Sequence, residues 1–339
     1  MSTNFSHGLE SRGVPIMGGL LDFFQDENIF FVDGDNGSDS NAGTDTKSAK
    51  KTIQGAVDAA TAGAIIYIRP KKPVALAQDP TSYAETIIIP HSKPGLSLIG
   101  IPRGRVQGGL PQIKIGAGST AMIDVRAPGC LIANLGINGA SSTGGGILLT
   151  DDGTDPATNY AAWGTTIVDC HFKNCAGSAA ADTGGAIQWA ATGGAWQTLI
   201  KGCEFFRCMA GVMNKGTTGS RPVDVVIEDC IFYTNDSALV DCDIYLMGGS
   251  GVDGLLIRDC TFATRTIPAY AGTSRYLKLT GCSDGLVSGC TFNCLSNVAA
   301  TELSWGTAGT AGFIPAGIGI AGCFGVSTTS GEVGYVCNV

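Results

Sequence analysis

A seven-residue pattern recurs through the second half of this 339-residue chain and constrains its fold more than any other feature. Its clear copies are TIVDCHF (166–172), LIKGCEF (199–205), VIEDCIF (226–232), LIRDCTF (256–262) and LVSGCTF (286–292). An earlier copy at 131–137 has Leu135 in the Cys position, and a degenerate copy at 319–325 keeps Cys323 but loses the Phe. Successive copies lie 27 to 35 residues apart, and self-similarity at such a period is typical of a solenoid.

Each copy predicts two short strands joined by a bend of one residue. Apolar residues alternate after the bend as they do in a strand. The residue before the Cys position is always Asn, Asp or Gly, the residue types that best tolerate a left-handed backbone. These bend positions are Asn134, Asp169, Gly202, Asp229, Asp259, Gly289 and Gly322.

Further short apolar runs lie between the copies, so each period holds two to three strands. With 50 Gly and only 15% charged residues, the chain is predicted to be all-β, a single-stranded right-handed parallel β-helix with about 30 residues per coil. Like residues then stack in inward-facing ladders, which are Cys170, Cys203, Cys230, Cys260 and Cys290, and Phe172, Phe205, Phe232, Phe262 and Phe292. We expect the thiols to be reduced; disulfides between adjacent coils are the alternative, because the strand spacing is near the permitted Cα separation.

The N-terminal third has a different pattern. KKTIQGAVDAA (50–60) has helical spacing and is expected to cap the β-helix. Together with FFVDGDNGSDSNAG, AIIYIRP, YAETIIIP and LSLIG, it resembles the cap and first coils of the pectin-lyase-like β-helix superfamily, and the resemblance extends over about residues 29–325. That superfamily contains lyases, hydrolases, isomerases and inert virion proteins, so the resemblance implies a fold and leaves the activity open.

Residues 4–19, NFSHGLESRGVPIMGG, resemble the leader of β-helix virion proteins of tailed bacteriophages. The resemblance implies an extended arm that anchors the chain to a particle; a disordered tail is the alternative. The predicted organisation is an arm (1–28), a cap with the first coils (29–100), a β-helix body (101–298) and a Gly/Ala-rich closing segment (299–339). The predicted anchoring residues are Phe5, Arg12, Val14, Pro15, Ile16 and Met17.

Carboxylates are the candidates for catalysis, since hydrolases of this superfamily pair two of them. Asp169, Asp229 and Asp259 occupy the bend position, where Gly replaces them in sister copies, so we interpret them as structural. Glu228 is expected to be outward and solvated, with no ladder of charge around it. Asp241 and Asp243 are the best catalytic alternative, because alternation places them on one face about 7 Å apart. Our prediction is that no catalytic residue is present.

No metal or cofactor is expected, because the chain has three His and no C-x₂-C pair. The loop with Asp33, Asp35, Asn36, Asp39 and Asn41 is either a calcium site or a set of Asx-turns, and Asx-turns are favoured. The four tryptophans, Trp163, Trp189, Trp196 and Trp305, are expected near loops or outer strands. There they would serve a subunit interface or, less favoured, a glycan groove.

A net charge of −8 argues against nucleic-acid binding, and the chain lacks an apolar run long enough to span a membrane. No secretory signal is visible, so synthesis in a host cytoplasm is expected. The resemblance implies a virion structural protein on the particle exterior, a capsid decoration or spike. Its expected partners are two copies of itself, in a homotrimer, and the major capsid protein or another virion protein. The alternative is a tailspike or receptor-binding protein that binds host surface polysaccharide, or cleaves it as a lyase or glycoside hydrolase.

Overall fold

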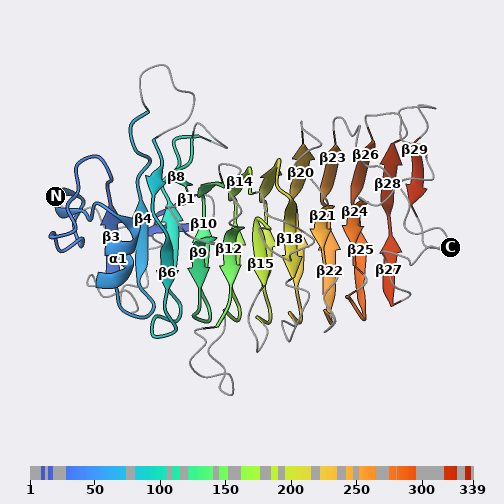
Figure 1. Ribbon diagram of the computed structural model, residues 1–339, viewed down its shortest axis with the longest axis horizontal. Coiled ribbons are helices and arrows are strands. Elements are labelled where there is room, and N and C mark those ends of the chain that lie inside the picture. The colour runs from blue at the N-terminus through green and yellow to red at the C-terminus, as the bar shows by residue number, and fades with distance from the viewer. Residues whose placement is uncertain are drawn as a thin grey trace.

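The computed structural model describes most of the chain. The described residues are 9–11, 14–17, 28–73, 81–104, 109–114, 121–139, 145–151, 162–175, 185–189, 195–214, 222–234, 242–246, 252–264, 275–279, 281–294, 317–326 and 333–336. Three long sheets run along the molecule, and their strands lie across its long axis (Figure 1). The fold is the right-handed parallel β-helix that the repeat predicts.

Sheet 1 holds the strands that precede each predicted bend. In spatial order they are β3 (Ile29–Val32), β4 (Ile65–Ile68), β7 (Ser97–Gly100), β10 (Leu131–Ala133), β13 (Thr166–Val168), β16 (Leu199–Lys201), β19 (Val226–Glu228), β22 (Leu255–Arg258), β25 (Gly285–Ser288) and β27 (Ile318–Ala321). All neighbours are parallel and pair copy to copy, so that Ile167 lies opposite Ile200, and Ile200 opposite Ile227.

Sheet 2 holds the strands that follow the bend. They are β5 (Tyr83–Ala84), β8 (Gln112–Lys114), β11 (Gly136–Asn138), β14 (His171–Lys173), β17 (Glu204–Phe206), β20 (Ile231–Thr234), β23 (Thr261–Thr264), β26 (Thr291–Cys294), β28 (Cys323–Val326) and β29 (Val333–Val336). The last strand, β29, is antiparallel to β28, whereas the other pairs of this sheet are parallel.

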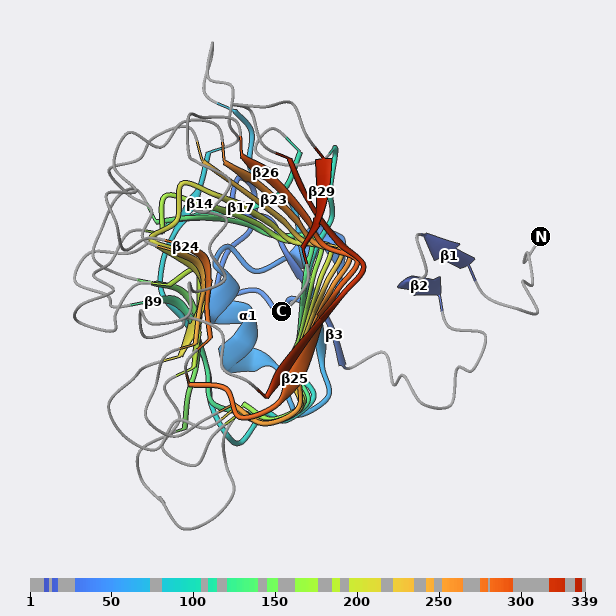
Figure 2. The same ribbon diagram turned by 90° about the vertical axis from the view of Figure 1, so that its right-hand side faces the viewer.

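Sheet 3 closes the cross-section on the side opposite sheet 1 (Figure 2). Its strands are β6 (Ile87–Ile89), β9 (Ala121–Val125), β12 (Gly145–Leu149), β15 (Ile187–Trp189), β18 (Ala210–Asn214), β21 (Cys242–Tyr245) and β24 (Arg275–Lys278). Ile123, Ile147, Ile187, Val212 and Ile244 form one fully buried row along it.

The bend between sheets 1 and 2 is a single left-handed residue in each coil. The backbone φ is 56° at Asn134, 51° at Asp169, 62° at Gly202, 55° at Asp229, 53° at Asp259, 63° at Gly289 and 61° at Gly322. Viewed along the axis, these bends superimpose as one sharp edge where the two sheets meet (Figure 2). A one-residue turn resets the alternation of side chains, so the buried residues around it lie three apart in sequence, as Ile167 and Cys170 do.

Two further left-handed columns accompany this one. The first lies five residues before the bend and contains Gly95, Gly129, Gly164, Gln197, Asp224 and Gly254. The second lies five residues after it, at Asn174 and Arg207. Sequence analysis found only the central column, because the other two lie outside the seven-residue pattern and include Gln197 and Arg207, types that are not typical of positive φ.

The core consists of stacked identical side chains. The rings of Phe172, Phe205, Phe232, Phe262 and Phe292 lie nearly parallel, with centroids 4.6 to 5.0 Å apart. The Cys ladder runs beside them, and each thiol donates to a backbone carbonyl of the preceding coil at 3.7 to 4.0 Å, as Cys203 does to Ile167. Ten described cysteines are buried and free, among them Cys175 and Cys208, which follow the second extra column.

The helix α1 (Ile53–Ala59) covers the N-terminal opening, where it appears inside the cross-section (Figure 2). Ile53, Ala56 and Val57 are fully buried against the first coil, as the helical spacing predicts. Thr52 caps the helix by accepting from the Gly55 amide at 3.0 Å. A short 3₁₀ helix, η2 (Thr46–Ser48), precedes it. At the other end β27 and β28 add one more coil inside the expected closing segment.

Candidate functional site

The catalytic alternative named from sequence is only partly described. Asp241 lies outside the described residues. Asp243, on β21, is buried, and burial raises the pKa of its carboxyl to about 8. Its Oδ2 has no hydrogen-bond partner among the described residues. A carboxyl in this environment is neutral at pH 7, so on the described residues Asp243 is a buried acid and not one half of a solvent-facing pair.

The bend carboxylates have a structural use that sequence analysis recognised only in part. A Cβ on Gly202 would collide with Oδ1 of Asp169, and a Cβ on Gly289 would collide with Oδ1 of Asp259. Each Asp side chain therefore lies along the axis, over the next bend residue. At these two coils the Gly leaves room for the Asp side chain of the preceding coil, whereas Asp259 follows Asp229 without a Gly.

Glu228 corrects a prediction. Its side chain is only 7% exposed, so it is not solvated. Its Oε1 accepts from Lys201 Nζ at 2.8 Å, and its Oε2 accepts from Arg258 Nε at 2.6 Å. The bond from Lys201 lowers the pKa of Glu228 most, and the bond from Arg258 lowers it further. Lys201, Glu228 and Arg258 stand in register on three adjacent strands, so a ladder of alternating charge does form.

A groove of about 550 Å³ lies along the outside of the bend between sheets 1 and 2. The bend residues Asn134, Asp169, Gly202 and Asp229 line it together with Val168, Cys170, His171, Lys201 and Glu204. Pro102, Gly104 and Leu110 form the remaining wall. A volume of this size is in the range of ligand sites, about 300–1,000 Å³.

The wall of the groove is held in place by local contacts. The Arg103 amide donates to the Gly109 carbonyl at 2.8 Å, which closes the base of the loop. Gln112 Nε2 donates to the Leu110 carbonyl at 3.2 Å. The Gln112 side chain lies over Gly136, where a Cβ would collide with it. The glycine of coil 131–137 therefore makes room for the side chain that supports the wall.

Two buried polar side chains from sheet 2 reach the groove. His171 is 2% exposed and Glu204 is 9% exposed, and they lie opposite each other on β14 and β17. The Tyr233 hydroxyl approaches both, at 3.3 Å from His171 Nε2 and 3.5 Å from Glu204 Oε2. This cluster joins a carboxylate, an imidazole and a phenol beside a concave surface, which is chemistry suited to binding hydroxyl groups. Sequence analysis did not predict this cluster or the groove.

The charge of the groove is predominantly negative. Asp169, Asp229 and Glu204 contribute carboxylates, whereas Lys201 is the single Lys or Arg that lines it. Lys201 Nζ lies 2.8 Å from Glu228 and 3.7 Å from Asp229. Because its closest bond is to Glu228, which does not line the groove, Lys201 offsets only part of the negative charge.

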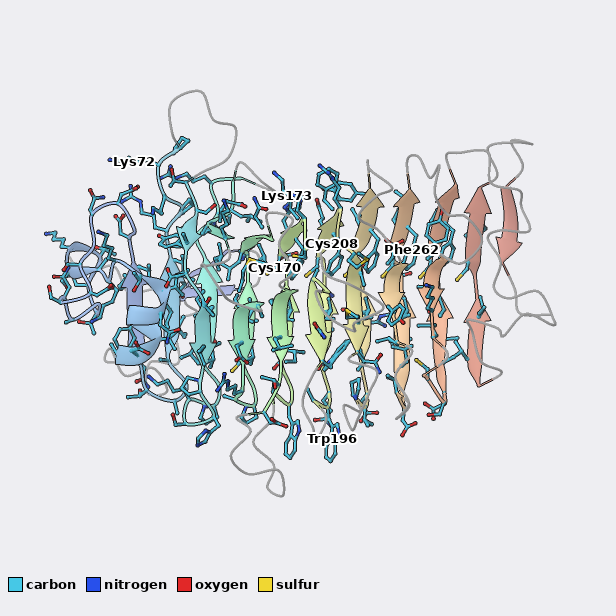
Figure 3. All side chains as sticks on the ribbon, in the orientation of Figure 1. Lys72, Cys170, Lys173, Trp196, Cys208 and Phe262 are labelled. Atoms are coloured by element: carbon cyan, nitrogen blue, oxygen red, sulfur yellow. The ribbon has the colours of Figure 1, made fainter. Side chains whose placement is uncertain are left out.

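The tryptophans divide into different environments. Trp189 is fully buried and its Nε1 donates to Thr198 at 3.2 Å, which contradicts the expected place near the surface. Trp163 and Trp196 stack at 5.0 Å, and Trp196 is 44% exposed. Figure 3 shows Trp196 at one margin and Lys173 at the other, with Cys170 and Cys208 between them. Trp305 lies outside the described residues.

The acidic loop after β3 forms turns. Asp33 accepts from the amides of Asp35 and Asn36 and pairs with Arg69, while Asp39 accepts from the amides of Lys51 and Thr52. Asn41 donates to the Ala49 carbonyl. Asp33 thus forms an Asx-turn, as favoured from sequence, whereas Asp39 bonds to the backbone just before α1. Within the described residues, no group of three or more His, Cys, Asp or Glu is arranged to hold a metal ion.

The predicted anchoring arm contains regular structure. Strands β1 (Leu9–Ser11) and β2 (Val14–Met17) form an antiparallel hairpin, with Ser11 opposite Val14. The hairpin includes four predicted anchoring residues, Val14, Pro15, Ile16 and Met17, while Phe5 and Arg12 lie outside the described residues. In the described part of the chain, no helix is both long and apolar enough for a membrane span.

Comparison with known proteins finds similarity among solved structures. No protein-family model and no curated protein matches the chain. Among solved structures, a rhamnogalacturonan lyase is 13% identical over 78% of this chain and 74% of that chain, with a TM-score of 0.45. Rice weevil pectin methyl esterase is 14% identical over 93% and 84%, with a TM-score of 0.42. A GH136 lacto-N-biosidase from Eubacterium ramulus is 12% identical over 78% and 64%, with a TM-score of 0.38.

The rhamnogalacturonan lyase and the pectin methyl esterase are pectin-lyase-like parallel β-helix proteins. Similarity at this level says nothing about a shared activity. The fold assignment for this chain rests on its own strand pairing.

Proposed function

We propose that the chain is a structural protein of a tailed-phage virion, a decoration or spike on the particle exterior that assembles as a homotrimer. Its partner would be the major capsid protein or another virion protein. The observation that supports anchoring is the N-terminal hairpin. It belongs to none of the three sheets of the β-helix, and α1 already covers the N-terminal end of the core. Residues 9–17 are therefore not needed to complete the described coils.

Deletion of residues 1–21 tests the anchoring role. We expect the shortened protein to keep the thermal unfolding of the full chain, because the three sheets and α1 are intact, but to lose binding to purified particles. Co-sedimentation with particles measures occupancy, and circular dichroism verifies the fold. A folded deletion variant that binds particles as well as the full chain does would refute anchoring by this segment.

Glycan binding is the second candidate function, and the groove favours it. A concave surface with a few converging polar groups is the usual form of a small-ligand site. His171 and Glu204 are buried yet line this groove, and Tyr233 bonds to both. Binding of host surface polysaccharide is compatible with a place on the particle exterior.

A further inference from the structure

The bend residues that line the groove carry more negative charge than a left-handed bend requires. The bend needs only a residue that accepts a left-handed backbone, and Asn134 and Gly202 meet that need with φ of 56° and 62°. The two other bend residues that line the groove are nevertheless Asp169 and Asp229. Both side chains are exposed, so neither carboxylate is required to fill the core.

The arrangement of charge distinguishes among ligands. Asp169, Asp229 and Glu204 come from three successive coils, which places carboxylates along the length of the groove. Lys201 Nζ lies 2.8 Å from Glu228 and 3.7 Å from Asp229, so it neutralises part of this charge. Asp169 and Glu204 keep the surface acidic. Anionic chains such as polyuronates would be repelled by this surface, whereas a protonated amine would find carboxylate acceptors.

The remaining lining suits a ring with one apolar face. Pro102 and Leu110 contribute apolar groups to the lining, and His171 and Glu204, here called the floor, contribute polar groups. A pyranose ring presents C–H groups on its faces and hydroxyl groups around its edge. Linear polyamines lack the hydroxyl groups that the imidazole and carboxylate of the floor can bond.

We propose that this groove binds an amino sugar, a carbohydrate that carries a free protonated amine, with Asp169 and Asp229 as the residues that determine the preference for the amine. The proposal rests on the second candidate function, glycan binding. It names the chemical class of the ligand and the place on the β-helix, and it holds for the isolated protein as well as for a particle.

The test is calorimetric titration of the full chain at neutral pH. The probes are glucosamine disaccharide, its N-acetylated form, digalacturonate and spermidine. We expect the glucosamine disaccharide to bind at least about tenfold more tightly than each of the other three. In Asp169→Asn/Asp229→Asn this preference should fall by at least about tenfold, because Asn keeps the left-handed bend and removes only the charge.

Asp259→Asn is the matched control, because Asp259 occupies the same bend position but does not line the groove. It should bind like the unmodified chain, and all variants should unfold at similar temperatures. Equal binding of the N-acetylated disaccharide would overturn the amine preference and leave glycan binding in place. Equal or tighter binding of digalacturonate or spermidine, or unchanged binding by the double variant, would also overturn the proposal. Failure of every sugar to bind would remove glycan binding itself.

Discussion

At the scale of the residue, Asn, Asp and Gly share the bend position but differ in what their side chains do there. Asn, Asp and Gly all tolerate positive φ, but only Asp extends a carboxylate over the next coil. Gly202 and Gly289 each follow an Asp whose Oδ1 occupies the space of a Cβ. Gly322 follows another Gly, and the nearest atom to its missing Cβ is 3.9 Å away.

Gly202→Ala is therefore expected to destabilise the protein more than Gly322→Ala. Both substitutions incur the cost of a left-handed Ala, about 1–2 kcal/mol. Gly202→Ala adds a collision with Oδ1 of Asp169, an exposed side chain that must rotate away at a cost of about 0.5–1.5 kcal/mol. Urea denaturation of both variants measures the difference. Equal losses of stability at the two positions would show that the Asp side chain moves aside without cost.

Asp243 predicts a pH dependence of stability. Burial raises its pKa to about 8 in the folded protein, whereas an unfolded chain titrates near 4. The folded state therefore retains a proton that the unfolded state releases, and stability falls as pH rises from about 4 to about 8. The slope is at most about 1.4 kcal/mol per pH unit, and it vanishes above the folded pKa.

Asp243→Asn removes this titration. The variant should lose less stability than the unmodified chain between pH 5 and pH 8, as measured by urea unfolding at both values. Parallel stability curves for the two proteins would mean that water or neighbouring chain reaches the carboxylate and restores an ordinary pKa.

At the scale of the element, the sequence predicted the structures that depend on neighbouring residues, which are the strands and the central bend. It missed the structures that depend on contacts between coils, which are the charge ladder and the groove. The strands around each Cys were predictable because the pattern repeats within seven residues. The bends at Gln197 and Arg207 were missed because neither residue type is typical of positive φ; their amides bond to Val223 and Tyr233 of the next coil. Glu228 was predicted to have no charge ladder around it, and its pairing with Lys201 and Arg258 on the adjacent strands was overlooked. The groove requires the loop that carries Pro102 and Leu110 to fold against later coils, which no local pattern reveals.

At the scale of the whole molecule, the core runs the length of the β-helix as a set of continuous columns. Ten of the thirteen cysteines are buried and free in the described part of the chain. Burial raises the pKa of Cys130 and of Cys282 to about 12, so these groups are thiols and not thiolates at neutral pH. Thiols in such surroundings are inert.

A thiol-reactive dye should therefore label at most three cysteines per native chain and all thirteen after denaturation in guanidinium. The labelling rate of the ten buried thiols then reports how the coils open. Mass spectrometry of the labelled chain counts the modified residues. Fewer than thirteen labels in denaturant without reductant would indicate disulfides between coils and contradict a reduced ladder.

The direction of the hydrogen bonds between coils has a mechanical consequence. These bonds point along the long axis, while the chain winds around it. Tension applied between the first and last coils is therefore borne by one coil at a time, and the molecule should peel from its ends in steps of about one period. Compression along the same axis is borne by every stacked column at once. The β-helix should therefore resist compression along its axis much better than tension along it.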